Sequence, residues 1–199
     1  MKHLHQELVE VYAFQSPKEG KSYCGDSYYF TATEDYFLSV LADGLGSGQY
    51  AYEASSAVAD VVRNNANDDV ETLMKSCNEV LMQKRGAAVA ILKVNFKTKE
   101  FDYSCVGNIR FYLYTPKGKL IYPLPVTGYL SGRPQNFRTQ RFSYERNSKF
   151  LLHSDGFKVK TSKSLLKGCK AIELIAKEMK NEQQQSKEDD STCIIGSLH

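Results

Sequence analysis

The chain has 199 residues and a formal net charge of +3 at pH 7. This length suits one domain, residues 1–199, around a core of moderate size. The hydrophobic content of 42% and the charged content of 25% are those of an ordinary globular protein. Because the net charge is small and the basic residues are dispersed, nothing in the composition indicates binding to nucleic acid or to a membrane surface.

The N-terminus and the cysteines indicate a cytoplasmic protein. The first seven residues lack the apolar core of a signal peptide, and no apolar run approaches the roughly 18 residues that span a bilayer. The five cysteines are widely spaced and form no CxxC pair, so neither a disulfide framework nor a zinc site is predicted. Free thiols in a reducing compartment are the expectation.

The N-terminal part of the chain predicts three strands followed by two helices. The strands, rich in β-branched and aromatic residues, are residues 8–14, 28–31 and 36–41. A glycine-rich turn at 44–48 then leads into a helix whose apolar residues recur at helical spacing. A second helix is predicted over residues 70–83.

The remainder of the chain predicts a series of strands separated by turns. They are residues 87–96, 101–106, 111–115, 120–122, 140–144, 149–153 and 192–198. A loop is expected at 123–134, a helix at 171–180 and a polar connector at 182–190. Strands that follow one another without helices between them indicate antiparallel pairing, so these strands and the three helices predict two antiparallel sheets covered by helices.

Four acidic motifs stand beside these apolar runs. They are residues 24–27 (CGDS), 42–46 (ADGLG), 153–156 (HSDG) and 189–192 (DDST). Taken singly, an Asp-Gly pair is a common turn and an Asp before Ser is a common helix cap. In combination, the carboxylates can converge from separate strand ends. They belong to Asp26, Asp43, Asp155 and one of Asp189 or Asp190.

Such a cluster of carboxylates suits magnesium or manganese, which prefer oxygen ligands. Gly44 adds a backbone carbonyl at a position where a missing side chain allows close approach. Two cations about 4 Å apart, sharing one carboxylate, would acidify a bound water and brace an in-line phosphoryl displacement. The helix that starts after Gly48 also offers free backbone N–H groups to a phosphate.

The motifs and their order resemble the PPM/PP2C superfamily of metal-dependent protein phosphatases, in its compact bacterial branch. The resemblance covers about residues 20 to 196 and rests on 25–27 (GDS), 42–48 (ADGLGSG), 85–90 (RGAAVA), 105–110 (CVGNIR), 152–156 (LHSDG) and 189–192 (DDST). It implies an α+β fold, an α-β-β-α sandwich of two antiparallel sheets flanked by helices. It also implies a phosphoserine or phosphothreonine phosphatase that uses two Mn²⁺ or Mg²⁺ ions.

The resemblance also implies a role for each acidic residue. Asp43 would bridge both ions and hold the attacking water, which makes it the catalytic residue. Asp155 and Asp189 would complete the first ion site, while Asp26 and the Gly44 carbonyl would serve the second. Asp189 is preferred to Asp190 because the family ligand is the first residue of its motif. The candidate substrate-binding residues are Gly46, Ser47 and Gly48.

A narrower resemblance is to the stressosome feedback phosphatases of sigma-B stress signalling. It rests on 19–22 (EGKS), 122–125 (YPLP) and 128–132 (GYLSG). It implies a cytoplasmic enzyme, expected to be a monomer, that removes phosphate from STAS-domain scaffold proteins and gives negative feedback on the stress response. The alternatives are a phosphatase of a free anti-anti-sigma factor and a non-catalytic scaffold that binds STAS proteins.

Three positions depart from the pattern of the larger family members. Leu45 replaces a histidine that protonates the leaving oxygen, so His153 is either a substitute acid or a packed core residue. Asn108 stands where an aspartate often serves an extra metal site, which argues against a tightly held third cation. No arginine matches the family's phosphate anchor, and Lys21 is a weak substitute.

Two further expectations concern the surroundings of the site. Arg110 is expected to brace the sheet. Tyr129, Leu130 and Arg133, in the 123–134 loop, are candidates either for docking a protein substrate or for packing on the core. Since residues 134–149 leave no room for the flap of many relatives, an open site that accepts a folded partner is expected.

Overall fold

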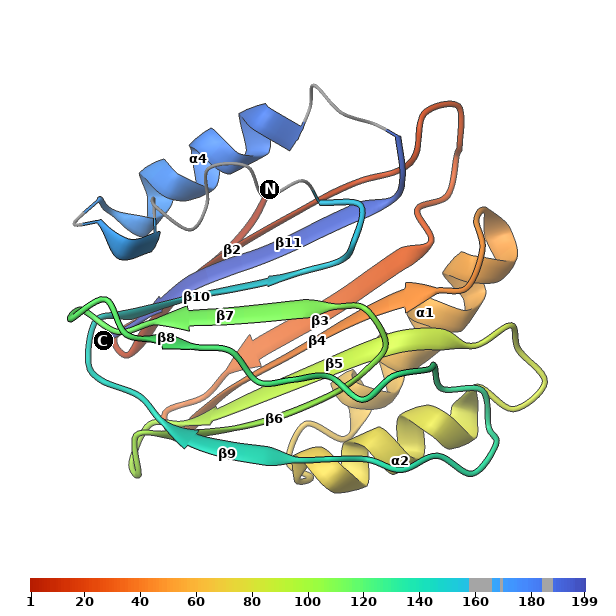
Figure 1. Cartoon of the computed structure of the whole chain (residues 1–199), viewed down its shortest axis with the longest axis horizontal. Helices are drawn as coiled ribbons and strands as arrows, with labels where there is room; N and C mark the ends of the chain where they lie inside the picture. The colour runs from red at the N-terminus through yellow and green to blue at the C-terminus, as the bar shows by residue number, and fades with distance from the viewer. Residues whose placement is uncertain (158–165, 169, 184–187) are drawn as a thin grey trace.

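The structure is a computed structural model that describes residues 1–157, 166–168, 170–183 and 188–199. Two antiparallel sheets stack face to face, and helices cover both outer faces (Figure 1). The predicted α+β sandwich of two antiparallel sheets flanked by helices is confirmed.

One sheet of the described chain has six strands and is covered by helix α4 (Ile172–Gln183). Its strands, in spatial order, are β1 (Lys2–Gln6), β2 (Val9–Ser16), β11 (Ser191–Leu198), β10 (Ser148–His153), β7 (Arg110–Tyr114) and β8 (Leu120–Ile121). Strand β11 is buried along its whole length. It is the central partner of β2 and β10, with α4 above it, so no face of it reaches solvent.

The other sheet has five strands in the described chain and is covered by two helices, α1 (Gln49–Asn64) and α2 (Val70–Val80). Its strands, in spatial order, are β3 (Asp26–Ala32), β4 (Tyr36–Gly44), β5 (Ala87–Asn95), β6 (Glu100–Val106) and β9 (Gln140–Ser143). Asp69 caps α2 by accepting a 2.9 Å hydrogen bond from the backbone N–H of Thr72, which satisfies one of the free donors at the helix start.

Alternation of side chains along the strands separates the core into layers. On β4, Phe37 and Leu41 pack between the sheets, while Leu38, Val40 and Ala42 pack under the helices. The layer between the sheets is rich in stacked aromatic rings, and its most buried large residues are Phe37, Phe101, Tyr103, Phe111 and Phe150. A third layer lies between the six-stranded sheet and α4. This alternation fixes which strand residues face the gap between the sheets.

Two details differ from the sequence prediction, and a third decides between alternatives that the sequence left open. Residues 2–6 form strand β1, which was not expected because only Leu4 in it is half-buried and no apolar alternation marks it. Leu130 is fully buried and exchanges backbone hydrogen bonds with Ala87, so this candidate packs on the core instead of docking a partner. Helix α4 continues to Gln183, and therefore the expected connector is partly helical; residues 184–187 of it lie outside the described residues.

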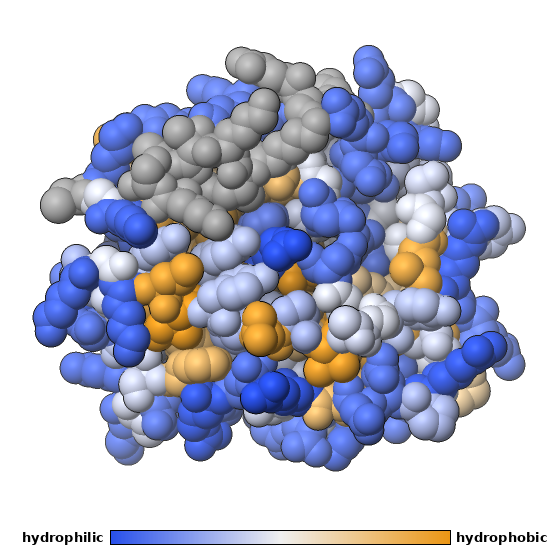
Figure 2. All heavy atoms as spheres, viewed as in Figure 1, coloured by the Kyte–Doolittle hydropathy of each residue, from blue (hydrophilic) through white to orange (hydrophobic). Residues whose placement is uncertain are grey.

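The surface and the thiols complete the description. Hydrophilic residues dominate the face in Figure 2, and hydrophobic ones form small separate patches. Of the part of the chain that is described, no helix has the length and apolar character needed to cross a bilayer. The four described cysteines, Cys24, Cys77, Cys105 and Cys193, are free, as predicted. Cys169 lies outside the described residues.

Candidate active site

The acidic motifs lie at one edge of the sandwich, where strands from both sheets begin or end. Strand β3 begins at Asp26 and β4 ends at Asp43 and Gly44, and the two aspartates are direct partners in the antiparallel register. In the other sheet, Asp155 follows the end of β10 and Asp190 precedes the start of β11. These strand ends gather at the right-hand edge of Figure 1. The sandwich thus brings together motifs up to 164 residues apart in sequence.

Strand alternation turns the key side chains into the gap between the sheets. Asp43 continues the series of Phe37 and Leu41, which pack between the sheets, and Asp26 continues that of Phe30. In the same way Ser154 continues the series of Leu152 on β10. The strand patterns that build the core therefore also aim these polar groups at one another.

A buried hydrogen-bond chain links the two sheets at this edge. The hydroxyl of Ser154 donates to Oδ2 of Asp26 at 2.6 Å and accepts from the backbone N–H of Thr192 at 2.9 Å. Gln15 donates from Nε2 to the backbone carbonyl of Asp26 at 2.8 Å. Ser154 was quoted within a motif without a role at the sequence level. A serine between a predicted strand end and an aspartate is the feature of the sequence that could have suggested this role for Ser154.

The carboxylates surround a hollow of about 210 Å³. Its described lining residues are Asp43, Gly44, Leu45, Gly46, Ala88, Asn108, Asp155, Asp189 and Asp190. Asp155 and Asp189 are exposed, Asp43 is half-buried and Asp190 is buried. Asp26, only 1% exposed, is absent from this described lining and instead lines a second hollow, together with residues of β3 and α1. The arrangement is a shallow acidic depression that is open to solvent.

The crowding of these acids raises two of their pKa values. Burial is the main cause for Asp43, and the charges of Asp26, Asp155, Asp189 and Asp190 add to it, which together raise the pKa of Asp43 to about 8. Burial also raises the pKa of Asp26 to about 6, against the opposing effect of its hydrogen bonds. Buried carboxylates with like charges as neighbours are unfavourable in the ionised form unless a cation compensates them.

The carboxylate oxygens at this edge are of the kind that a hard divalent cation prefers, but they lie too far apart to bind one ion without moving. Oδ1 of Asp26 is buried and has no hydrogen-bond partner in the described structure, which leaves a lone pair free for a cation. However, the carboxylate oxygens of Asp43, Asp155 and Asp189 do not all lie within 4.8 Å of one another. Among the described residues, only a group on strands β1 and β2 has three ligand atoms this close together. The acids share one hollow, and an ion would have to draw their side chains inward.

The two consecutive aspartates before β11 have different environments. Oδ1 of Asp190 accepts a 2.9 Å hydrogen bond from the backbone N–H of Lys18, and its side chain is buried. Asp189 is exposed at the hollow, and its Oδ1 accepts from the backbone N–H of Asp190 at 2.9 Å. Each aspartate thus has one oxygen bonded to a backbone N–H, and the two differ in exposure, since Asp190 is buried in the wall and Asp189 is exposed at the hollow. The choice of Asp189 as the ligand stays a prediction.

Glycine is required where backbone segments cross beneath the hollow. A Cβ on Gly44 would overlap the carbonyl group of Ala51 in α1, and a Cβ on Gly156 would overlap the carbonyl oxygen of Asp190. Both glycines therefore allow the acidic turns to lie against their neighbours. Gly44 itself is among the residues that line the hollow.

The turn between β4 and α1 contains the candidate substrate-binding residues. Gly46 and Gly48 have positive φ values of 91° and 78°, and Gly48 caps α1 without a side-chain hydrogen bond. No acidic residue occupies the first turn of α1, and Glu53, one turn further on, accepts a 2.8 Å hydrogen bond from Nε2 of Gln49. Ser47 is exposed in this turn.

Arg85 was not assigned a role from the sequence, yet it lies beside this turn. A Cβ placed on Gly46 would be 2.7 Å from Nη1 of Arg85, so the guanidinium is in contact with the turn. The same guanidinium lies 5.2 Å from the ring centroid of Tyr50, at the start of α1. Arg85 thus places a positive charge next to Gly46, which lines the acidic hollow. The sequence did not indicate this, because Arg85 is far from the Asp-Gly motif along the chain.

His153 packs away from the hollow. It is 4% exposed, and on the side of the sheet that α4 covers it stacks on Tyr112 at a centroid distance of 5.9 Å and meets the tilted ring of Phe157 at 5.5 Å. Nδ1 donates to the Ser154 carbonyl at 2.8 Å, and burial lowers the pKa of the imidazole to about 4. Of the two interpretations left open by the sequence, the packed core histidine is the one that the structure supports.

Of the remaining candidate residues, one contacts an acid of the hollow and two do not. Asn108 donates from Nδ2 to Oδ2 of Asp155 at 2.7 Å, so this neutral residue positions a carboxylate at the hollow. Arg110 donates to the hydroxyl of Tyr122 at 3.0 Å, in keeping with its expected role in bracing the sheet. Lys21 is exposed and is absent from the described lining of the hollow.

Comparison with known proteins agrees with this geometry. The family model described as Stage II sporulation protein E (SpoIIE) matches residues 33–198. The phosphoserine phosphatase RsbX of Bacillus subtilis (strain 168) is 44% identical over 192 residues, which are 96% of this chain and 96% of that protein. The crystal structure of RsbX in complex with magnesium has a TM-score of 0.95 at 43% identity and covers 100% of this chain and 99% of that chain.

A more distant structure has the same fold. The PP2C phosphatase domain of SpoIIE from Bacillus subtilis gives a TM-score of 0.81 at 16% identity, covering 96% of this chain and 63% of that chain. The stacked antiparallel sheets, the outer helices and the acidic edge define a PP2C-type serine/threonine phosphatase. The chain belongs to the SpoIIE family of these enzymes. The narrower resemblance is to RsbX, and it is confirmed at 44% identity. The magnesium-bound relative supports a divalent ion as cofactor.

Proposed function

We propose that this phosphatase removes phosphate from phosphorylated STAS-domain proteins of a stressosome, in the cytoplasm, and so gives negative feedback on the sigma-B stress response. The observation that carries the catalytic part is the convergence of Asp26, Asp43, Asp155 and Asp189 on one edge, with two pKa values raised. The similarity to RsbX supports the substrate, together with a TM-score of 0.83 at 26% identity to a structure described in work on the bacterial stressosome, which covers 96% of this chain and all of that one.

Two divalent ions, Mn²⁺ or Mg²⁺, are proposed at this edge. Asp43 would be shared by both, with Asp155 and Asp189 at the first and Asp26 and the Gly44 carbonyl at the second. Such ions supply an acidified water and neutralise the charge of a phosphoryl group. The partnerless Oδ1 of Asp26 and the exposure of Asp189 at the hollow support this assignment.

The protein's own residues orient the phosphate. The backbone N–H groups of the Gly46–Gly48 turn and the start of α1 would receive its oxygens. The Arg85 guanidinium, in contact with Gly46, would add a charge-assisted hydrogen bond. Because His153 faces away from the hollow, the proton for the leaving oxygen would come from solvent water.

A folded protein partner suits the shape of the site. Asp155 and Asp189 are exposed in a shallow depression, and exposed tyrosines surround the glycine turn. Tyr50 is 64% exposed, and Tyr129 is 47% exposed beside Gly86. Tyrosines present large rigid contact areas at low entropic cost, which is typical of protein-recognition surfaces. We expect the single phosphatase domain, residues 1–199, to act as a monomer.

The experiment that tests the proposal compares two phosphoproteins side by side. Phosphorylated STAS-domain scaffold and phosphorylated anti-anti-sigma factor are incubated with the enzyme and Mn²⁺, and phosphate release is followed for each. We expect the scaffold to be dephosphorylated at least tenfold faster, about 1.4 kcal/mol in activation free energy. A faster reaction with the anti-anti-sigma factor would contradict the proposed substrate, and binding of the scaffold without phosphate release would indicate the non-catalytic alternative.

A further inference from the structure

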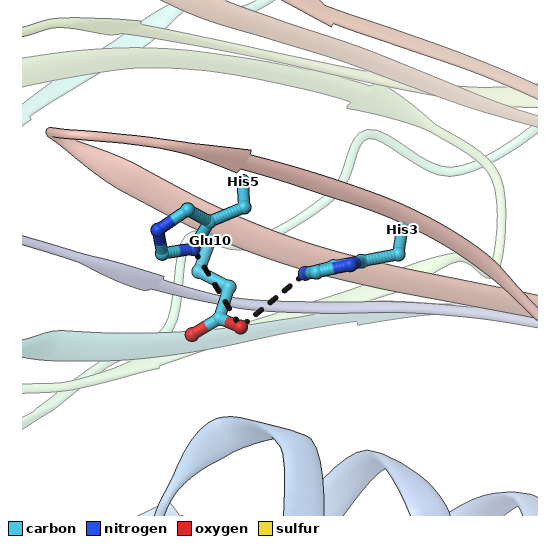
Figure 3. A group of neighbouring side chains, drawn as sticks. All are labelled: His3, His5 and Glu10. Atoms are coloured by element: carbon cyan, nitrogen blue, oxygen red, sulfur yellow. Dashed lines mark hydrogen bonds and ion pairs between the residues drawn. The ribbon is translucent and has the colours of Figure 1, made fainter.

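Three side chains outside the acidic edge gather on the β1–β2 hairpin. His3 and His5 are two residues apart on β1, so they point to the same face of the sheet, and His5 is the direct cross-strand partner of Glu10 on β2. Nε2 of His3 lies 3.3 Å from Oε1 of Glu10, and Nδ1 of His5 lies 3.8 Å from the same oxygen. Figure 3 shows both imidazole rings directed at the carboxylate, on the side that faces a helix.

Tyr12, the next residue on this face of β2, holds two of the three side chains in place. Its ring stacks on His3 with a centroid distance of 4.2 Å and an interplanar angle of 7°. Its hydroxyl donates to Oε1 of Glu10 at 2.8 Å. Tyr12 itself is 4% exposed and packs in the layer beneath α4, so its position is fixed. Partners of this kind orient metal ligands and restrict their rotamers.

The spacing fits one tetrahedral ion. The three ligand atoms all lie within 4.8 Å of one another, and among the described residues no other group of three meets this condition. Ligand atoms about 2.0–2.2 Å from a tetrahedral zinc ion lie roughly 3.3–3.6 Å apart. Two of the separations are already 3.3 and 3.8 Å.

The chemistry of the donors selects the kind of ion. Imidazole nitrogen suits zinc, copper and nickel, whereas magnesium prefers an all-oxygen set. We propose that His3, His5 and Glu10 bind one divalent transition-metal ion, such as Zn²⁺, with water in the remaining position. The site ties the edge strand β1 to β2.

This site is separate from the acidic edge. Glu10 is near the start of β2, whereas Gln15, which contacts Asp26, is near its end. Five residues of strand separate them, roughly 17 Å at about 3.3 Å per residue. A nearby carboxylate on α4, Glu173, is held by Lys177 at 2.7 Å, so the proposed ligands are the three hairpin residues. Loss of the hairpin ion therefore leaves the phosphatase residues intact.

The test is a calorimetric titration of the whole protein with Zn²⁺ in buffer that contains saturating Mg²⁺. We compare the natural protein, the double variant His3→Ala/His5→Ala and the control Asp43→Asn. The double variant is expected to bind one Zn²⁺ fewer per chain, and Asp43→Asn is expected to retain the hairpin ion. Circular dichroism and manganese-dependent phosphatase activity of the double variant, both expected to be unchanged, show that the fold is intact.

A conservative variant tests the supporting residue. Tyr12→Phe keeps the stacked ring but removes the hydroxyl on Glu10, and it is expected to weaken Zn²⁺ binding about tenfold. Equal Zn²⁺ stoichiometry and affinity in the natural protein and in His3→Ala/His5→Ala would overturn the proposal. The three side chains would then form only surface ion pairs.

Discussion

The hydroxyl of Ser154 donates a 2.6 Å hydrogen bond to Oδ2 of Asp26 and thereby joins the end of β10 to the start of β3. The two strands belong to different sheets, so this contact crosses the gap between them. It is buried, and Ser154 also accepts from the backbone N–H of Thr192 on β11. The Ser154 hydroxyl therefore positions the Asp26 carboxylate relative to the acids of the opposite sheet, and Gln15 of β2 holds the Asp26 backbone carbonyl across the same gap.

Replacement of Ser154 by alanine should destabilise the protein. Oδ1 of Asp26 already lacks a partner, and the substitution leaves Oδ2 buried without its donor. We expect a loss of about 1–3 kcal/mol in the free energy of unfolding, the cost of an unsatisfied buried polar group. Urea denaturation measures it. Ser143→Ala, at an exposed position of β9, is the matched control, with an effect within about 0.5 kcal/mol. Equal stability of both variants would show that the bond does not matter.

The pH dependence of stability should report the crowding of the acids. The folded state raises the pKa of Asp43 from its ordinary value of 3.8 to about 8. Between these pH values the folded protein holds a proton that the unfolded chain has lost, so stability of the metal-free protein falls as the pH rises from about 4 to 8.

Asp43→Asn removes this pH-dependent penalty. At pH 8 without metal the variant should exceed the natural protein in unfolding free energy by at least about 1.4 kcal/mol, the equivalent of one pKa unit, and the difference should vanish near pH 4. Chemical denaturation with a chelator present, at both pH values, measures it. Asp35→Asn, in an exposed turn, is the control. A destabilised Asp43→Asn at pH 8 would mean that the carboxylate is stabilised by something other than a cation.

Arg85 should contribute to binding of the phosphorylated substrate. Because its guanidinium contacts the turn at Gly46, Arg85→Ala is expected to raise KM for a phosphoprotein about tenfold with a smaller change in kcat. A hydrogen bond to a charged group is worth about 1.5 kcal/mol or more, which corresponds to that factor. Steady-state kinetics measure both constants. Lys84→Ala removes an adjacent exposed charge and should leave KM within about twofold. A similar rise in KM for both variants would contradict a specific contact between Arg85 and the phosphate, because the effect would then come from the loss of positive charge alone.

Asn108→Asp should change the metal dependence. The amide of Asn108 donates to Asp155, and an added carboxylate replaces this bond with repulsion. We expect a lower melting temperature without metal and a lower Mn²⁺ concentration at half-maximal activity, since the site gains a charged ligand. Thermal unfolding and an activity titration measure the two effects. Asn108→Ala should lower stability without improving Mn²⁺ affinity; an equal gain in both variants would contradict a role for the added charge.

Local patterns in the sequence predict much of the fold and the acidic residues. The nearly continuous apolar run over residues 36–41 identifies β4, and the Asp-Gly pair that follows marks where it ends. Strand β1 escaped prediction because an exposed edge strand needs no apolar face. Its hairpin pairing with β2, which creates the His3–His5–Glu10 group, carries no turn signal in the sequence, because the connecting residues are Glu7 and Leu8 and not Gly, Asn or Asp.

Contacts between sheets are the part that the sequence could not supply. Ser154 and Asp26 are 128 residues apart, and only the stacking of the sheets shows that they bond. The direction of His153 follows from which face of β10 the helix α4 covers, and that too is a property of the packed fold. Arg85 reaches the glycine turn because β5 lies next to β4.

Phosphate release from a phosphoserine protein, with and without Mn²⁺, by the natural enzyme and by Asp43→Asn tests the central claim most directly. The account predicts Mn²⁺-dependent release by the natural enzyme and a loss of at least about 10³-fold in Asp43→Asn, a little over 4 kcal/mol in transition-state stabilisation. The folded state of the variant is checked in the same samples by its denaturation curve. Mn²⁺-dependent turnover by Asp43→Asn at a rate close to that of the natural enzyme would contradict the account.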